Sequence, residues 1–191
     1  MEKSAKLGKL TLLNIILFGF IGQVAWAVEN NFFNTFLFSF GGTTKDISTM
    51  VAASAVVAVV TTFVMGTLSD KLGRRKVFIC AGYVAWGITV MAFAFISREN
   101  LGKLIGADPS SAAALSATVT TVIVMDCIMT FMGSTSNDSA FNAWITDVTV
   151  PSNRAKTEGL LAILPVLALV IVTGVFGFIA GDDAQASVSY T

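Results

Sequence analysis

Five long apolar stretches constrain this chain more than any other feature. They cover roughly residues 10–39, 48–69, 77–97, 113–145 and 158–181. A helix that crosses a bilayer needs about 20 mostly apolar residues, and its backbone polar groups must pair within the segment. The pattern predicts an all-α membrane domain over 10–181, between an N-terminus at 1–9 and a polar tail at 182–191.

The short polar connections carry signals for where these helices begin. Ser48 is a candidate N-cap for the second helix, and Ser110 or Ser111 is a candidate for the fourth, because serine side chains accept bonds from first-turn N–H groups. The connection over residues 98–111 has the composition of a polar loop.

The composition excludes several classes of function. Charged residues make up 13% of the chain, about half the usual share for a soluble domain. The net charge is zero, so nucleic acid is not an expected partner. There is no histidine, no nucleotide-binding loop and no nucleophile elbow, so we predict neither an enzyme nor a metal or cofactor site.

The basic residues predict the orientation of the chain in a plasma or inner membrane. Cytoplasmic segments are enriched in Lys and Arg, and nine of the twelve basic residues lie in segments that the predicted spans place on the same side of the membrane as the N-terminus. The N-terminus is therefore expected in the cytoplasm, and the polar tail outside. The nine residues are Lys3, Lys6, Lys9, Lys71, Arg74, Arg75, Lys76, Arg154 and Lys156.

An alternative interpretation of the N-terminus is a cleaved signal peptide. A basic start, an apolar run and the sequence Ala25-Trp26-Ala27 imitate its three parts. The apolar run continues past that site to Phe40, however, as a complete span would. Four further spans follow, so either interpretation leaves the chain in the membrane.

The loop between the second and third spans carries the most distinctive motif, GTLSDKLGRRK from Gly66 to Lys76. Gly66 allows close approach of another helix, and Gly73 allows the chain to reverse. Asp70 and Arg74 are four residues apart and can form an ion pair. The basic residues of this loop also fix the topology, whatever else they do.

This motif resembles the loop signature of the major facilitator superfamily. The segment Asp147–Gly159, which contains Arg154, resembles the link between spans four and five of the same family. The resemblance implies transport by alternating access and five helices of an N-terminal six-helix bundle. It also implies a conformational latch on the cytoplasmic side, formed by Gly66, Asp70, Gly73, Arg74, Arg75, Asp147 and Arg154.

The first span suggests a branch of that family. Gly22 and the pair Trp26-Ala27 resemble the opening helix of glycoside–pentoside–hexuronide and sucrose symporters. The sodium–melibiose group carries two acidic residues in the second span, where this chain has Ala58 and Thr62, so protons are favoured over sodium. The Gly-Pro-rich pattern of drug/proton antiporters is reduced to an isolated Pro165.

Two acidic residues within the spans are candidates for cation coupling. A charge at mid-bilayer costs at least about 2.5–3.5 kcal/mol, so Glu29 and Asp126 are functional candidates by default. Both lie a few residues outward of the middle of their spans, at a similar depth. In the resembled fold the first and fourth spans line one cavity, which the two carboxylates could share.

Polar residues at helical spacing predict a substrate wall for a sugar-like molecule. Amide groups and one aromatic ring suit a ligand with many hydroxyls and an apolar ring face. The alternative is that the amides hold helices together through hydrogen bonds. The candidates are Gln23, Trp26, Asn30 and Asn34 in the first span, with Thr130 and Asn137 in the fourth.

The expected function is proton-coupled sugar symport, and other functions stay open. An exporter or antiporter of another solute is one alternative, and a transport-inactive membrane scaffold or sensor is another. A transporter of this type has two six-span halves. We therefore expect the chain to be a fragment, truncated in the tail, whose partners are a sixth span, a C-terminal half and the bilayer.

Overall fold

The computed structural model describes residues 7–188 and contains helices throughout. Lys3 and Lys6, and residues 189–191 of the expected tail, lie outside the described residues. The elements are α1 (Lys9–Ser39), α2 (Thr44–Leu72), α3 (Arg75–Ala92), η1 (Phe93–Phe95), α4 (Arg98–Ile105), α5 (Ala112–Gly133), η2 (Ser134–Phe141), α6 (Asn142–Val148) and α7 (Pro151–Val188).

Five helical stretches among residues 7–188 are long and apolar enough to cross a membrane. α1, α2 and most of α7 each supply one, α3 continues through η1, and α5, η2 and α6 form one continuous stretch. The predicted all-α architecture with five spans is therefore confirmed. The helices are longer than the predicted spans, and which of their residues lie within the bilayer stays a prediction.

The predicted cap of the second helix is wrong. The helix begins at Thr44 with Thr43 as its N-cap, whose hydroxyl accepts from the backbone of Asp46 while the Asp46 carboxylate accepts from Thr43. The N-cap of this reciprocal capping box, Thr43, lies five residues before Ser48. Ser111, one of the two candidates for the fourth span, does cap α5 through the N–H of Ala114.

The connection expected as a loop contains a short helix, α4. Ser97 caps it through the N–H of Asn100, and Gly106 ends it in the left-handed conformation. Lys103 lies 2.6 Å from Glu99 one turn away and lowers the pKa of that carboxyl. A helix of eight residues has only about two turns, too few for apolar residues to recur at helical spacing. The sequence pattern therefore gave little indication of α4.

The last helix begins earlier than the predicted fifth span and extends further. Pro151 lies in the first turn, where the missing N–H of proline costs nothing. Residues 182–188, expected in the polar tail, continue the helix. Pro165 lies inside it, where one backbone hydrogen bond of the helix is lost.

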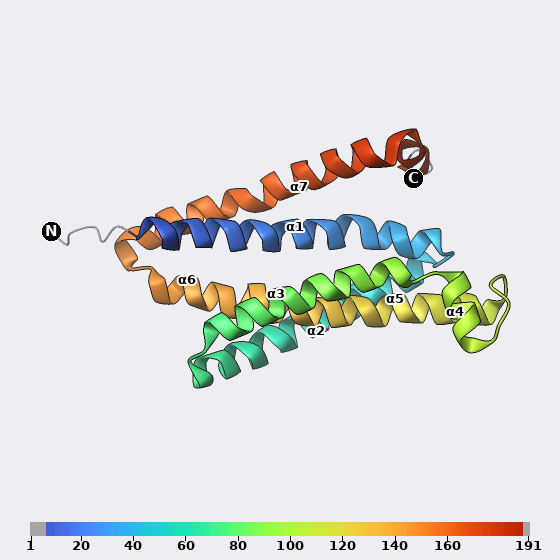
Figure 1. The fold of residues 1–191 in the computed structure, drawn as a ribbon, viewed down its shortest axis with the longest axis horizontal. Coiled ribbons are helices and arrows are strands. Elements are labelled where there is room, and N and C mark those ends of the chain that lie inside the picture. The colour runs from blue at the N-terminus through green and yellow to red at the C-terminus, as the bar shows by residue number, and fades with distance from the viewer. Residues whose placement is uncertain (1–6, 189–191) are drawn as a thin grey trace. The chain divides into compact units, whose positions relative to one another are not determined.

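The chain forms two compact units. One contains most of α1 together with α7, and its buried apolar side chains include Ile15 and Ala168. The other contains Phe32–Asp147, in which α2 and α3 pack against α5 and η2, and α4 packs against α5 (Figure 1). In this second unit the end of α1 contacts η1 through the rings of Phe33 and Phe93, whose centroids are 4.2 Å apart.

Candidate functional site

The turn between α2 and α3 positions the charged residues of the motif. Gly73 ends α2 with φ of 60°, and its N–H donates to the carbonyls of Ser69 and Asp70. This left-handed conformation favours glycine. Because the chain reverses there, α3 begins two residues later at Arg75, and the side chains on both sides of the turn face each other.

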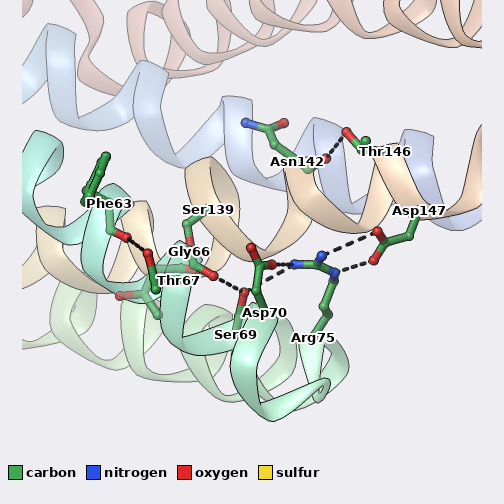
Figure 2. Close-up of polar contacts among 11 residues, drawn as sticks. Phe63, Gly66, Thr67, Ser69, Asp70, Arg75, Ser139, Asn142, Thr146 and Asp147 are labelled. Atoms are coloured by element: carbon green, nitrogen blue, oxygen red, sulfur yellow. Dashed lines mark hydrogen bonds and ion pairs between the residues drawn. The ribbon is translucent and has the colours of Figure 1, made fainter.

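Arg75 holds three elements together at this turn, and we call its ion pairs with Asp70 and Asp147 the Arg75 bridge (Figure 2). Its Nη1 lies 2.6 Å from Oδ1 of Asp70, at the end of α2. Its Nε donates to Asp147 at the end of α6, and Nη1 also donates to Ser69. The planar guanidinium can satisfy both carboxylates at once, which a lysine ammonium cannot do in the same geometry.

The predicted pair between Asp70 and Arg74 is wrong, because the partner of Asp70 is Arg75. A pairing of residues four apart requires an uninterrupted helix. α2 ends at Leu72, and Arg74 lies before α3 with φ of −115° and an exposed side chain. The turn therefore carries Arg74 away from Asp70 and turns Arg75 toward it.

The bridge lines a pocket of about 640 Å³ within the unit 32–147. The guanidinium side chain is 20% exposed, while the carboxylate side chains of Asp70 and Asp147 are 61% and 50% exposed. An ion pair this open to solvent contributes only about 0–1 kcal/mol. The lining residues are Ser69, Asp70, Gly73, Arg74, Arg75, Lys76, Val77, Trp144 and Asp147.

Close helix approach occurs at Gly82 rather than at Gly66. A Cβ at Gly66 would lie 3.9 Å from Cβ of Ser139, an ordinary contact, so the predicted reason for this glycine does not hold. A Cβ at Gly82 would lie 2.6 Å from Cβ of Ser136 on η2. The sequence offered no motif that distinguished Gly82 from other glycines in the spans.

A second polar cluster lies on η2, inside the fourth span. We call it the η2 cluster: Tyr83 of α3 with Ser134, Asn137 and Asp138 of η2. The Tyr83 hydroxyl donates to Oδ1 of Asn137 at 2.9 Å, and Nδ2 of Asn137 donates to Asp138 at 2.9 Å. The Ser134 hydroxyl donates to the other carboxylate oxygen of Asp138, also at 2.9 Å. These bonds satisfy polar groups that would otherwise be costly inside a span.

Asn137 was predicted as a site residue, but its contacts in this cluster were not, because the cluster joins α3 to η2. η2 is a π-helix, whose wider turn places its side chains differently from those of an α-helix. Spacing rules within one helix gave no reason to join Tyr83 to Asn137 and Asp138. The available signal was composition, since six consecutive polar residues, Ser134–Ser139, interrupt an otherwise apolar span.

The two predicted coupling carboxylates are both buried, in different units of the chain. Asp126 of α5 is 2% exposed, and the Ser54 hydroxyl of α2 is a hydrogen-bond partner of its carboxyl. Glu29 of α1 is 8% exposed. The idea that they share a cavity stays a prediction, as does their role in coupling.

The predicted substrate residues also fall in both units: Gln23, Trp26 and Asn30 in the first, and Asn34, Thr130 and Asn137 in the second. Thr130 and Asn137 are buried in α5 and η2 within the second unit. On α1, Gln23, Trp26 and Asn34 are half-buried. Asn30 is exposed, and its amide donates to the carbonyl of Trp26 in its own helix at 2.9 Å, as expected for an amide on a helix surface.

The last predicted latch residue, Arg154, lies in the first turns of α7. Its Nε donates to the hydroxyl of Thr149 at 3.1 Å. Thr149 is buried and lies just before the helix. The described contacts of Arg154 thus stabilise the start of α7, and its participation in a latch stays a prediction.

Five apolar helices among the described residues are those of an integral membrane protein, and the Arg75 bridge joins the ends of three of them. Comparison with protein families matches residues 13–186 to the Major Facilitator Superfamily. The chain belongs to this family, whose members are membrane transporters rather than enzymes. No curated protein and no solved structure matches the chain.

Proposed function

We propose that the chain belongs to a secondary transporter that moves a sugar or glycoside by proton-coupled symport. Membership of the Major Facilitator Superfamily supports transport of a small molecule across the bilayer. The choice of a sugar as substrate and of a proton as coupling ion is supported by finer features of the sequence. Resemblance of the Gly22–Ala27 segment to sucrose and glycoside symporters supports the substrate class.

The observation that carries proton coupling is the burial of two carboxylic acids in apolar helices. Asp126 and Glu29 are among the buried residues of α5 and α1. A low-dielectric surrounding favours the protonated form of a carboxyl group, so such a group can load a proton when water reaches it and release it on the other side. Asp126 is the stronger candidate, because its described partner is the neutral hydroxyl of Ser54 and not a cation.

The substrate side chains in this proposal are amides, a hydroxyl and one indole ring. Asn137 offers a buried amide, Thr130 a buried hydroxyl, and the half-buried Trp26 an aromatic face. Such groups suit a sugar, whose hydroxyls bond to amides and whose ring stacks on an aromatic side chain. Gln23, Asn30 and Asn34 complete the proposed set on α1.

The Arg75 bridge is the proposed latch on the cytoplasmic side, with the N-terminus in the cytoplasm. It joins the ends of α2 and α6 through two carboxylates whose side chains are 61% and 50% exposed. Because each exposed ion pair contributes about 0–1 kcal/mol, it can break at small cost when the helices move. Alternating access requires such weak contacts at each closed end.

Uptake of radiolabelled sugars tests the coupling proposal. Cells expressing the reading frame that encodes this chain would be given a panel of sugars under a proton gradient, with and without an ionophore. We expect at least one sugar to accumulate, and Asp126→Asn and Glu29→Gln to reduce that uptake. Glu99→Gln, at an exposed carboxylate on α4, is the matched control and should change nothing.

Three outcomes contradict the proposal in different ways. Full proton-driven uptake in both Asp126→Asn and Glu29→Gln would remove these residues from coupling. Sugar binding to the purified protein without uptake would favour a scaffold or sensor. Outward movement of solute against the proton gradient would favour an antiporter.

A further inference from the structure

The pocket beside the Arg75 bridge contains cationic groups that the bridge does not use. Arg74 and Lys76 line it from the start of α3, and both are exposed. Neither forms an ion pair in the part of the chain that the structure describes. Three basic and two acidic residues line the pocket, and Arg75 already faces both carboxylates.

The pocket also lies where three candidate spans end. Its residues come from the last turn of α2, the first turn of α3 and the end of α6. Leu72 and Val77 beside it are 55% and 57% exposed, and Trp144 is part of its wall. Exposed apolar side chains and a tryptophan at the end of a span are typical of the layer where lipid headgroups meet acyl chains.

From this combination we propose that the pocket binds the phosphate of an anionic phospholipid through Arg74 and Lys76. Guanidinium and ammonium groups are strong donors to phosphate oxygens. The acyl chains would run along the exposed apolar surface at Leu72 and Val77. A free phosphate would gain the charge contact but not this apolar surface, so the lipid is the favoured source.

The site lies beside the Arg75 bridge, the proposed latch, but is independent of the proposed coupling and substrate residues. It uses neither the buried carboxylates nor the amides of the proposed substrate wall. A chain that transports nothing could still bind the lipid, and a sugar symporter could lack this site. Failure of one proposal therefore leaves the other intact.

Native mass spectrometry of the purified chain tests the site directly. The chain in detergent would be titrated separately with phosphatidylglycerol, with phosphatidylcholine and with inorganic phosphate. We expect phosphatidylglycerol to bind more tightly than the other two. The double variant Arg74→Gln/Lys76→Gln should weaken phosphatidylglycerol binding by about 30-fold, since each basic residue near an anionic lipid surface contributes about 1 kcal/mol.

Two matched variants distinguish binding at the pocket from non-specific attraction of the lipid to basic residues. Lys45→Gln/Lys103→Gln removes two exposed basic residues from elsewhere in the chain and should leave binding unchanged. Arg74→Lys/Lys76→Arg keeps both charges and should retain affinity within a few-fold. It keeps the test decisive if the neutral double variant does not fold.

Three results would overturn the proposal. One is unchanged phosphatidylglycerol affinity in the folded neutral double variant. Another is equal affinity for phosphatidylcholine, which would remove the role of charge. The third is binding of inorganic phosphate as tight as that of phosphatidylglycerol, which would identify a free anion as the ligand.

Discussion

The Arg75 bridge and the η2 cluster contain similar polar groups, but their contacts differ in how far they are exposed to solvent. The bridge joins charged side chains at the ends of α2 and α6, and its carboxylates are more than a third exposed. The η2 cluster lies within a span, where Asn137 is 5% exposed and its bonds connect mostly uncharged donors to one carboxylate. Solvent competes with the first group of contacts and hardly with the second.

This difference assigns different roles to the two regions. Contacts that water can replace break at little cost and suit a part that opens and closes. Contacts that shield polar groups from an apolar surrounding are costly to leave unmade and suit a fixed support. We therefore expect substitutions in the η2 region to change stability, and substitutions in the bridge to change conformational equilibria.

The largest effect on stability is expected for Gly82→Ala. The new Cβ would lie 2.6 Å from Cβ of Ser136, so α3 and η2 must separate. Overpacking of this kind costs about 1–3 kcal/mol. Gly87→Ala is the control in the same helix, because nothing lies within 4 Å of its Cβ position. Thermal unfolding in detergent measures both, and equal melting temperatures would contradict the close packing.

A smaller loss of stability is expected for Tyr83→Phe. The change removes the hydroxyl that donates to Asn137 and leaves the ring in place. Hydrogen bonds between membrane helices contribute about 0.6 kcal/mol on average and up to about 1.7 kcal/mol. Phe141→Leu changes an apolar side chain of the same segment without removing a hydrogen bond. A double-mutant cycle with Asn137→Ala isolates the bond, and a coupling energy of zero would show that it contributes nothing.

Arg75→Gln is expected to change stability least among these variants and transport most. Its ion pairs are exposed enough that the loss is about 0–1 kcal/mol. If the bridge biases two conformations, the same loss changes the uptake rate by up to about fivefold. Arg75→Lys should not restore full uptake, because one ammonium cannot face both carboxylates in the same way. Unfolding and uptake measured together would contradict this account if stability fell sharply while uptake stayed constant.

The smallest effect concerns pH and the exposed helix α4. Lys103 lowers the pKa of Glu99, so this carboxylate contributes to stability above its unfolded pKa, and the contribution is lost as pH falls through its lower folded pKa. We expect Lys103→Gln to return the pKa of Glu99 toward its ordinary value. An NMR titration of the glutamate side chain measures this, and an unchanged pKa would exclude Lys103 as the cause.

The sequence predicted the spans and the bridge region better than the η2 cluster, for physical reasons. An apolar stretch of 20 residues is a strong signal for a span. Gly73 likewise indicates where α2 ends, because glycine readily adopts the left-handed conformation found there. Arg75 was among the predicted latch residues, but the ion pair of Asp70 was assigned to Arg74, because the correct partner depends on where α2 stops. The η2 cluster joins two helices, and a period along one helix cannot indicate that Tyr83 of α3 meets Asn137 of η2.

The distance between the ends of α2 and α6 tests the central claim most directly, that the Arg75 bridge is a switch. Spin labels at Lys71→Cys and Thr146→Cys, both at exposed positions, would report it in a background with Cys80 and Cys127 replaced by serine. Pulsed electron resonance should give one dominant short distance with Arg75 present, and an added longer population in Arg75→Gln. Identical distance distributions in the two proteins would contradict the account.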